Sequence, residues 1–159
     1  MGPGARSRVG LEQVIGAVVP LPIPRSRPSP APLPVLPVRR LPSGGGSEVV
    51  MLDMARLDRS GRLSVRGLLR VLGWGPGHRV EVDVVDGAVV VTSAAAGRHT
   101  VGVRGELALP MAARQLCGLE AEAVVVAAGY PVEDLVVIHP ASTVARLLAE
   151  FHTRLAGGS

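Results

Sequence analysis

Residues 55–92, ARLDRSGRLSVRGLLRVLGWGPGHRVEVDVVDGAVVVT, decide the fold. Apolar and polar residues first alternate, as in a half-buried strand, and residues 66–72 then place leucines on one helical face and arginines on the other. Gly73 ends this short helix, and the Gly-Pro-Gly that follows prevents its continuation. Two valine-rich runs flank Asp86-Gly87, a two-residue hairpin signal. The predicted order is strand, strand, short helix and a hairpin of two strands.

Residues 99–138 repeat this order. Pro110 opens a second short helix over 111–116, and the valine-rich runs 124–126 and 135–138 predict a closing hairpin. Matching positions lie 44 residues apart: Gly61 and Gly105, Leu63 and Leu107, Arg70 and Arg114, Leu72 and Leu116. The pattern indicates an internal duplication, with copy 1 over 49–97 and copy 2 over 98–159. Because each copy is near the lower size limit for folding alone, we expect two copies, or two chains, to share one core.

The copies differ in chemistry at three matching positions: Arg62 is matched by Glu106, Arg66 by Pro110 and Gly77 by Glu122. The first two changes remove basic side chains from copy 2. The third replaces a turn glycine by glutamate, which predicts a different turn in copy 2.

Charge divides along the chain, whose 159 residues carry a formal net charge of +4. Residues 56–79 hold six arginines and one acid, whereas residues 80–159 hold five arginines and nine acids. A basic half joined to an acidic half indicates that a polyanion binds on one side only. Every basic residue is Arg, with no Lys and no Asn, which indicates a GC-rich bacterial genome.

The N-terminal residues 1–48 contain ten of the fourteen prolines and end in a Ser-Gly-rich run. This composition predicts a disordered tail with polyproline II character, either inert or bound by a partner through its PxxP spacing. An alternative is that translation begins at Met51 or Met54. No apolar run fits a signal peptide or a membrane span, so we expect a cytoplasmic, nucleoid-associated protein without a membrane partner.

Composition argues against most site chemistries. Three aromatic residues, one cysteine and four scattered histidines disfavour an aromatic cage, a disulfide framework and a cysteine-based zinc site. Ser60 and Ser64 show no nucleophile–base pattern. Residues 73–77 carry glycines after a helix and before a strand, the reverse of the order in a nucleotide-binding loop. We therefore expect no enzyme, no metal and no cofactor.

Five arginines of copy 1 are the candidate DNA-binding residues: Arg56, Arg59, Arg62, Arg66 and Arg70. Clustered guanidinium groups contact phosphates and read guanine edges with two hydrogen bonds. Only Asp58 lies within the stretch to neutralise them. We predict binding to double-stranded DNA; the alternative is a solvated face with local ion pairs.

Copy 1 also resembles the AbrB/MazE/SpoVT swapped-hairpin DNA-binding family. The matching residues are Asp58, Gly61, Arg62, Leu72, Gly73, Pro76, Gly77, Val80 and Val82. Position 66 departs, because the family usually has proline there. The resemblance covers residues 55–92 closely and 99–140 loosely, and two copies in one chain resemble the tandem MraZ-type members.

The resemblance implies an α+β, mainly β fold. It would consist of two tandem swapped-hairpin β-barrel half-units with short helices, forming a homodimer or an intrachain pseudo-dimer. It also implies a small bacterial transcriptional regulator that binds DNA through the turn and helix arginines of copy 1, while copy 2 serves assembly. The alternatives are an antitoxin of the MazE type with a toxin partner, and a scaffold that binds no DNA.

Residues 141–156 predict a C-terminal amphipathic helix capped by Ser142 or Thr143. Its apolar stripe consists of Val144, Leu147, Leu148, Phe151 and Leu155. The stripe fits either packing on copy 2 or a dimer contact.

Overall fold

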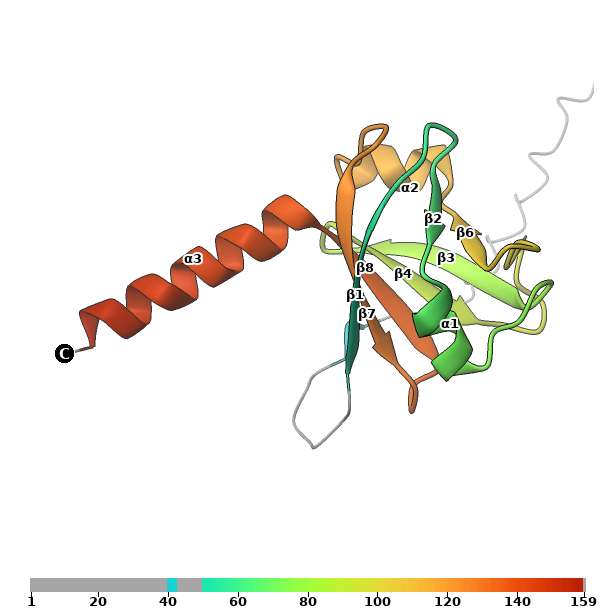
Figure 1. Ribbon diagram of the computed structural model, residues 1–159, viewed down its shortest axis with the longest axis horizontal. Coiled ribbons are helices and arrows are strands. Elements are labelled where there is room, and N and C mark those ends of the chain that lie inside the picture. Colours follow the sequence, from blue (N-terminus) through green and yellow to red (C-terminus); the bar gives the residue numbers. More distant parts are fainter. Residues whose placement is uncertain (1–39, 43–49, 159) are drawn as a thin grey trace, which may run out of the picture. The chain divides into compact units, whose positions relative to one another are not determined.

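The computed structural model describes residues 40–42 and 50–158 (Figure 1). All described residues belong to one compact unit, Arg39–Ser159. Apart from residues 40–42, the predicted tail over 1–48 lies outside the described residues.

The described residues form strands and short helices in the predicted alternation, followed by one long helix. The elements are β1 (Met51–Arg56), β2 (Arg62–Ser64), α1 (Arg66–Leu72), β3 (Arg79–Val85), β4 (Ala88–Ser93), β5 (His99–Thr100), β6 (Glu106–Ala108), α2 (Met111–Leu116), β7 (Val124–Tyr130), β8 (Leu135–Pro140) and α3 (Ala141–Gly157). The α+β, mainly β class is therefore confirmed. Met51 and Met54, the two alternative starts, both lie within β1.

Six strands form one antiparallel sheet in the order β1-β7-β8-β4-β3-β5, and β2 and β6 form a separate pair (Figure 1). The sheet does not close into a barrel in the described part of the chain, because β1 and β5 stay at opposite edges of the sheet. Two features keep it open. β5 has only two residues, and β2 and β6 pair with each other instead of bridging the edges.

The first strand of each copy pairs with the hairpin of the other copy. β1 of copy 1 lies beside β7, and β5 of copy 2 lies beside β3. β2 and β6 pair with Leu63 opposite Leu107, the two residues matched by the 44-residue repeat. Next to these strands, Leu57 N–H donates to Ala123 O at 2.9 Å and Val101 N–H donates to His78 O at 2.9 Å. This pairing is symmetric about an internal two-fold axis, and neither copy alone contains all the strands of the sheet.

The core is built from both copies. Its most enclosed side chains come from the central strands, the β2–β6 pair and α1, and include Leu63, Leu69, Val89, Val91, Val136 and Ile138, each at most 2% exposed. Burying one such side chain contributes about 1.5–3 kcal/mol. Within the described residues no polar or charged residue falls in the fully buried class. The apolar alternation read from the sequence therefore specifies one core shared between the copies.

The hairpin turn at Asp86-Gly87 forms as predicted, with φ values of 49° and 77°. The expectation of a different turn at Glu122 is wrong. Glu122 has φ 63°, close to the 82° of Gly77, and each turn is closed by an equivalent hydrogen bond: His78 N–H to Gly75 O at 3.0 Å and Ala123 N–H to Glu120 O at 3.2 Å. The pairing on either side imposes the turn, so glutamate adopts a left-handed conformation that costs about 1 kcal/mol or more.

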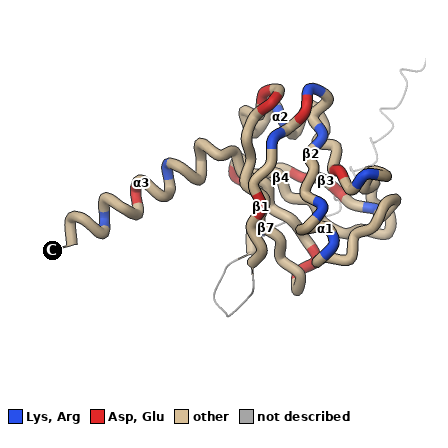
Figure 2. The backbone as a smooth tube through the Cα atoms, in the orientation of Figure 1, with Lys and Arg blue, Asp and Glu red and all other residues tan. Residues whose placement is uncertain are grey.

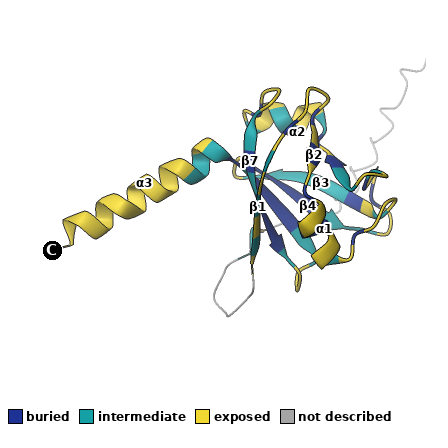
Figure 3. Ribbon diagram, in the orientation of Figure 1, coloured by how far each residue is buried: buried dark blue, intermediate teal, exposed yellow. Residues whose placement is uncertain are grey.

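α3 extends from the end of β8 and is exposed after its first turn (Figure 3). It follows Pro140 without a side-chain cap, so the predicted cap at Ser142 or Thr143 is wrong. Its apolar stripe is open, with Leu147 50%, Leu148 51% and Phe151 48% exposed. Beyond the first turn, then, α3 does not pack on copy 2. Among the described helices, none is both long and apolar enough to cross a membrane.

Candidate nucleic-acid interface

The turn between β1 and β2 is held by Asp58. One carboxylate oxygen, Oδ1, accepts hydrogen bonds from the backbone N–H groups of Ser60 and Arg62, both at 2.8 Å. Gly61 supplies the left-handed residue that the turn requires, with φ 77°. The only acid within the arginine stretch is thus occupied by the backbone, and it fixes the turn that carries Arg59.

All five predicted arginines are exposed, and they lie at the end of β1, on the β1–β2 turn, on β2 and on α1 (Figure 2). Arg56, Arg62 and Arg66 line one cleft of about 200 Å³, together with Asp58, Ser64, Arg104 and Glu106. We call this the turn cleft. Arg70 lines a neighbouring pocket that shares Arg66 and Arg104 with it. Arg59 lies on the turn and lines neither hollow.

No ion pair within the described residues involves these arginines. The ion pairs there include Arg98 with Glu81 at 2.6 Å and Arg146 with Glu150 at 2.7 Å, both away from the turn cleft. Arg56 donates to the backbone oxygen of Glu122 at 3.2 Å. Within this part of the chain, the guanidinium groups of the cluster therefore face solvent without a neutralising carboxylate bound to them.

Arg104 of copy 2 was not among the arginines predicted from the sequence, and it lies in the turn that precedes β6. The reciprocal pairing places that turn beside α1, where a Cβ added to Gly105 would lie 3.1 Å from Cγ of Arg66. Arg104 then lines both hollows with Arg66. The spacing of 44 gave no signal for it, because its counterpart in copy 1 is Ser60.

Glu106 also lines the turn cleft, contrary to the expectation that copy 2 serves assembly and contributes nothing to the site. Its side chain folds back over Gly102, and its Oε2 is buried without a hydrogen-bond partner in the described protein. A carboxylate beside Arg62 and Arg66 lowers the positive potential of the cleft. Both copies contribute to the candidate site, with opposite signs of charge.

Arg114, the counterpart of Arg70, has a structural environment instead. Its guanidinium packs against Gly61, and its Nε donates to the backbone oxygen of Leu109 at 3.1 Å. It is half-buried, whereas Arg70 is exposed. The repeat thus keeps the arginine while the two copies use it differently.

Other chemically active side chains serve the fold. His78 Nε2 and Ser93 Oγ lie 2.8 Å apart, and the His78 ring stacks on Trp74. Burial raises the pKa of the Cys117 thiol, which keeps it in the unreactive protonated form. Within the described ranges, 40–42 and 50–158, no group of three or more His, Cys, Asp or Glu is placed to hold a metal ion.

Compared with family models, curated proteins and solved structures, this chain has no match. The interpretation of the arginine cluster therefore rests on the geometry given above.

Proposed function

We propose that this chain is a DNA-binding protein, a small bacterial transcriptional regulator of the nucleoid. It binds duplex DNA through a basic surface made of Arg56, Arg59, Arg62, Arg66, Arg70 and Arg104. The observation that carries the proposal is the gathering of exposed guanidinium groups at the end of β1, on the β1–β2 turn, on β2 and on α1, while Asp58 is occupied by the backbone. Such groups contact phosphates, and arginine also reads guanine edges.

We also propose that the fold is an AbrB-like pair of swapped hairpins joined within one chain. Two observations support it. The first strand of each copy pairs with the hairpin of the other copy, and β2 pairs with β6 across an internal two-fold axis. In this assignment the pseudo-dimer needs no second chain to complete its core.

We also propose that α3 joins two chains. Val144, Leu148, Phe151 and Leu155 follow a 4-3-4 spacing, which is the seam of a coiled coil. Leu148, Phe151 and Leu155 of this seam are exposed, whereas the Arg146–Glu150 ion pair lies outside the seam. A seam of this kind on two identical helices is self-complementary and so favours a homodimer.

An antitoxin-like partner protein is the second candidate, and the same exposed stripe of α3 favours it. Exposed apolar patches mark protein contacts. A toxin-type partner would cover α3 and would leave purified protein monomeric in its absence, whereas the homodimer forms from this chain alone.

The test is a selection of fragmented genomic duplexes by the purified full chain, with the Arg62→Ala/Arg66→Ala double variant as control. The proposal predicts a recurring sequence among duplexes retained by the unchanged chain and loss of retention by the variant. Retention of no duplex by the unchanged chain contradicts DNA binding.

A further inference from the structure

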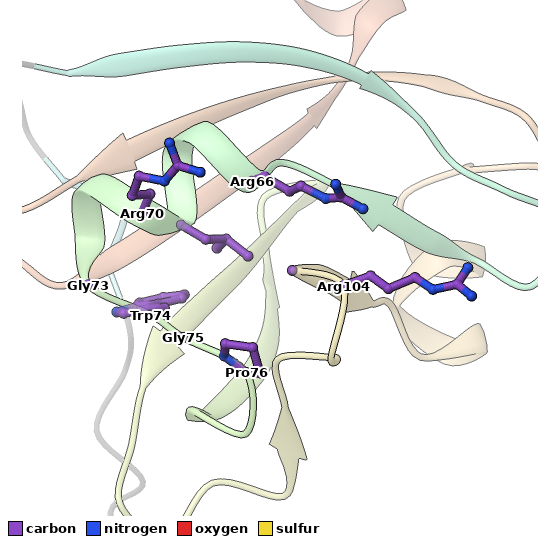
Figure 4. A pocket seen from close by; sticks show the side chains of 9 residues that line it. Arg66, Arg70, Gly73, Trp74, Gly75, Pro76 and Arg104 are labelled. Atoms are coloured by element: carbon purple, nitrogen blue, oxygen red, sulfur yellow. The ribbon is translucent and has the colours of Figure 1, made fainter.

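A second hollow, of about 410 Å³, lies next to the turn cleft, under α1 (Figure 4). Its bottom is formed by Leu69 and Trp74, which are 2% and 3% exposed, and its side by Pro76. Three arginines, Arg66, Arg70 and Arg104, also line it, and glycine backbone completes the wall. We call this the Trp74 pocket.

The apolar part of this pocket is held in place from behind. Trp74 Nε1 donates to Asp134 Oδ1 at 2.7 Å, and the Trp74 ring stacks on His78 with centroids 5.3 Å apart. Trp74 N–H also donates to the Leu69 oxygen at 2.9 Å. A floor fixed by such contacts is preorganised, which lowers the ordering cost of binding.

The charge lining the Trp74 pocket has one sign. Among the described residues that line it none is acidic, whereas the turn cleft holds Asp58 and Glu106. Figure 4 shows Arg66 and Arg104 extending in the same direction, away from Trp74, and Arg70 on the next turn of α1 with its guanidinium group also directed away from Trp74. Planar guanidinium groups bind carboxylates with two parallel hydrogen bonds.

We propose that the Trp74 pocket binds a small aromatic carboxylate. The ring would lie against Trp74 and Pro76, and the carboxylate would meet the guanidinium groups at the rim. The volume falls within the range of about 300–1,000 Å³ for small-molecule sites, which are largely apolar with few placed polar groups. A bare phosphate would leave the apolar floor unused, and a neutral aromatic would leave three unpaired guanidinium groups beside it.

Resting on the proposed function, a second step follows: the bound carboxylate acts as an effector. Arg66, Arg70 and Arg104 belong both to this pocket and to the basic surface, so their occupation by a carboxylate withdraws them from DNA. The anion and the duplex then compete, and each weakens the binding of the other by the same factor.

Direct binding is tested without DNA on the full chain. Trp74 is the only tryptophan, so its indole N–H gives a single signal in an amide-correlation NMR spectrum. The probes are 2-naphthoate, the neutral 2-naphthalenemethanol and inorganic phosphate. We expect 2-naphthoate to shift the Trp74 signal saturably and the neutral analogue to bind at least about tenfold more weakly, since a charge-assisted hydrogen bond contributes about 1.5–3 kcal/mol.

The matched variants are Arg70→Gln, inside the pocket, and Arg59→Gln, on the same basic surface but outside it. Arg70→Gln is expected to weaken 2-naphthoate binding about tenfold, and Arg59→Gln to leave it unchanged. No saturable shift with 2-naphthoate, equal binding of phosphate, or equal loss in both variants would each overturn the site.

Competition is measured separately, by titrating a duplex with the full chain in the presence of saturating 2-naphthoate. A rise in the apparent Kd for DNA supports the effector role, and an unchanged Kd overturns it. If 2-naphthoate binds but no duplex does, the proposed DNA function and the effector role fail while the carboxylate site stands.

Discussion

Glu122 has the backbone conformation of a turn glycine, and the repeat supplies its control in Gly77. We expect Glu122→Gly to stabilise the protein by about 0.5–1 kcal/mol, because it relieves a left-handed residue at some entropic cost. Gly77→Ala should destabilise the protein by about 1 kcal/mol. A Cβ at this position would meet no atom within 4 Å, so the loss comes from backbone strain and not from a clash. Urea unfolding of both variants measures this. A less stable Glu122→Gly protein would show that the Glu122 side chain itself supports the turn.

His139 predicts a pH dependence of stability. Partial burial lowers its pKa below the ordinary 6.5, so the folded state binds the proton less well than the unfolded chain. The contribution of neutral His139 to stability is therefore fully present above about pH 6.5, and it is lost as the pH drops toward the lowered pKa. His139→Gln should flatten the pH dependence of the free energy of unfolding just below about pH 6.5, measured by urea titrations at each pH.

Glu81 provides the check on that window. A hydrogen bond from Arg98 lowers the pKa of the Glu81 carboxyl below its ordinary 4.5, so its contribution is lost only in more acidic solution. An unchanged slope just below about pH 6.5 in His139→Gln would assign the dependence to another group.

The sequence predicted the five arginines as candidate site residues, but it did not predict that Arg104 and Glu106 lie beside them. Arg104 and Glu106 reach the same cleft only because the pairing of β2 with β6 crosses from one copy to the other. The role of Asp58 as a turn acceptor was equally hidden, since the same residue could have paired with an arginine. Charge counts give the sign of a surface, while packing decides which charges meet.

Among the elements, α3 carries the clearest prediction. Leu148→Glu places a charge in the proposed seam. It should raise the dissociation constant of the homodimer at least about tenfold, because two buried leucines are removed per dimer. Ala149→Glu, one position further along this exposed helix, should leave the dimer intact. Sedimentation equilibrium measures both, and each chain should keep its fold because Leu148 is 51% exposed within one chain. An unchanged chain that is monomeric at micromolar concentration contradicts the dimer and favours the partner-protein alternative.

Local signals in the sequence located most elements. The helix over 66–72, the helix over 111–116 and both hairpins formed where leucine periodicity, glycine stops and the Asp-Gly turn placed them. Two errors are local, the helix cap at Ser142 or Thr143 and the turn at Glu122, and the others concern long-range pairing. β5 has only two residues and the sheet stays open, and β1 and β5 each depend on a partner strand from the other copy.

For the whole molecule, the shared core predicts that half of the chain does not fold by itself. A chain of residues 49–97 holds β1 and β3 but lacks β7 and β5, their partners. We expect it to be unfolded, or folded only as a dimer that rebuilds the missing pairs, in a concentration-dependent way. Circular dichroism at several concentrations tests this. A folded, concentration-independent monomer would show that copy 1 has a core of its own.

The central claim is that the basic surface binds duplex DNA, and a salt titration of binding tests it most directly. The measurement compares Arg62→Ala, Arg70→Ala and Glu106→Ala on one duplex, with Arg154→Ala on α3 as control. All four residues but Glu106 are exposed, so the arginine variants should fold unchanged. We predict that Arg62→Ala and Arg70→Ala weaken binding, by about 1–3 kcal/mol for an arginine that reads a base and less for one that meets phosphate.

The slope of log Kd against log salt should flatten by roughly one for each phosphate that no longer meets an arginine. Glu106→Ala should bind equally well or more tightly, because a like charge leaves the turn cleft. If Glu106→Ala weakens binding as much as Arg62→Ala, the assignment of charges within the cleft is wrong. If none of the three changes binding relative to Arg154→Ala, the arginines form only a solvated face, and partner-protein binding replaces DNA recognition as the function.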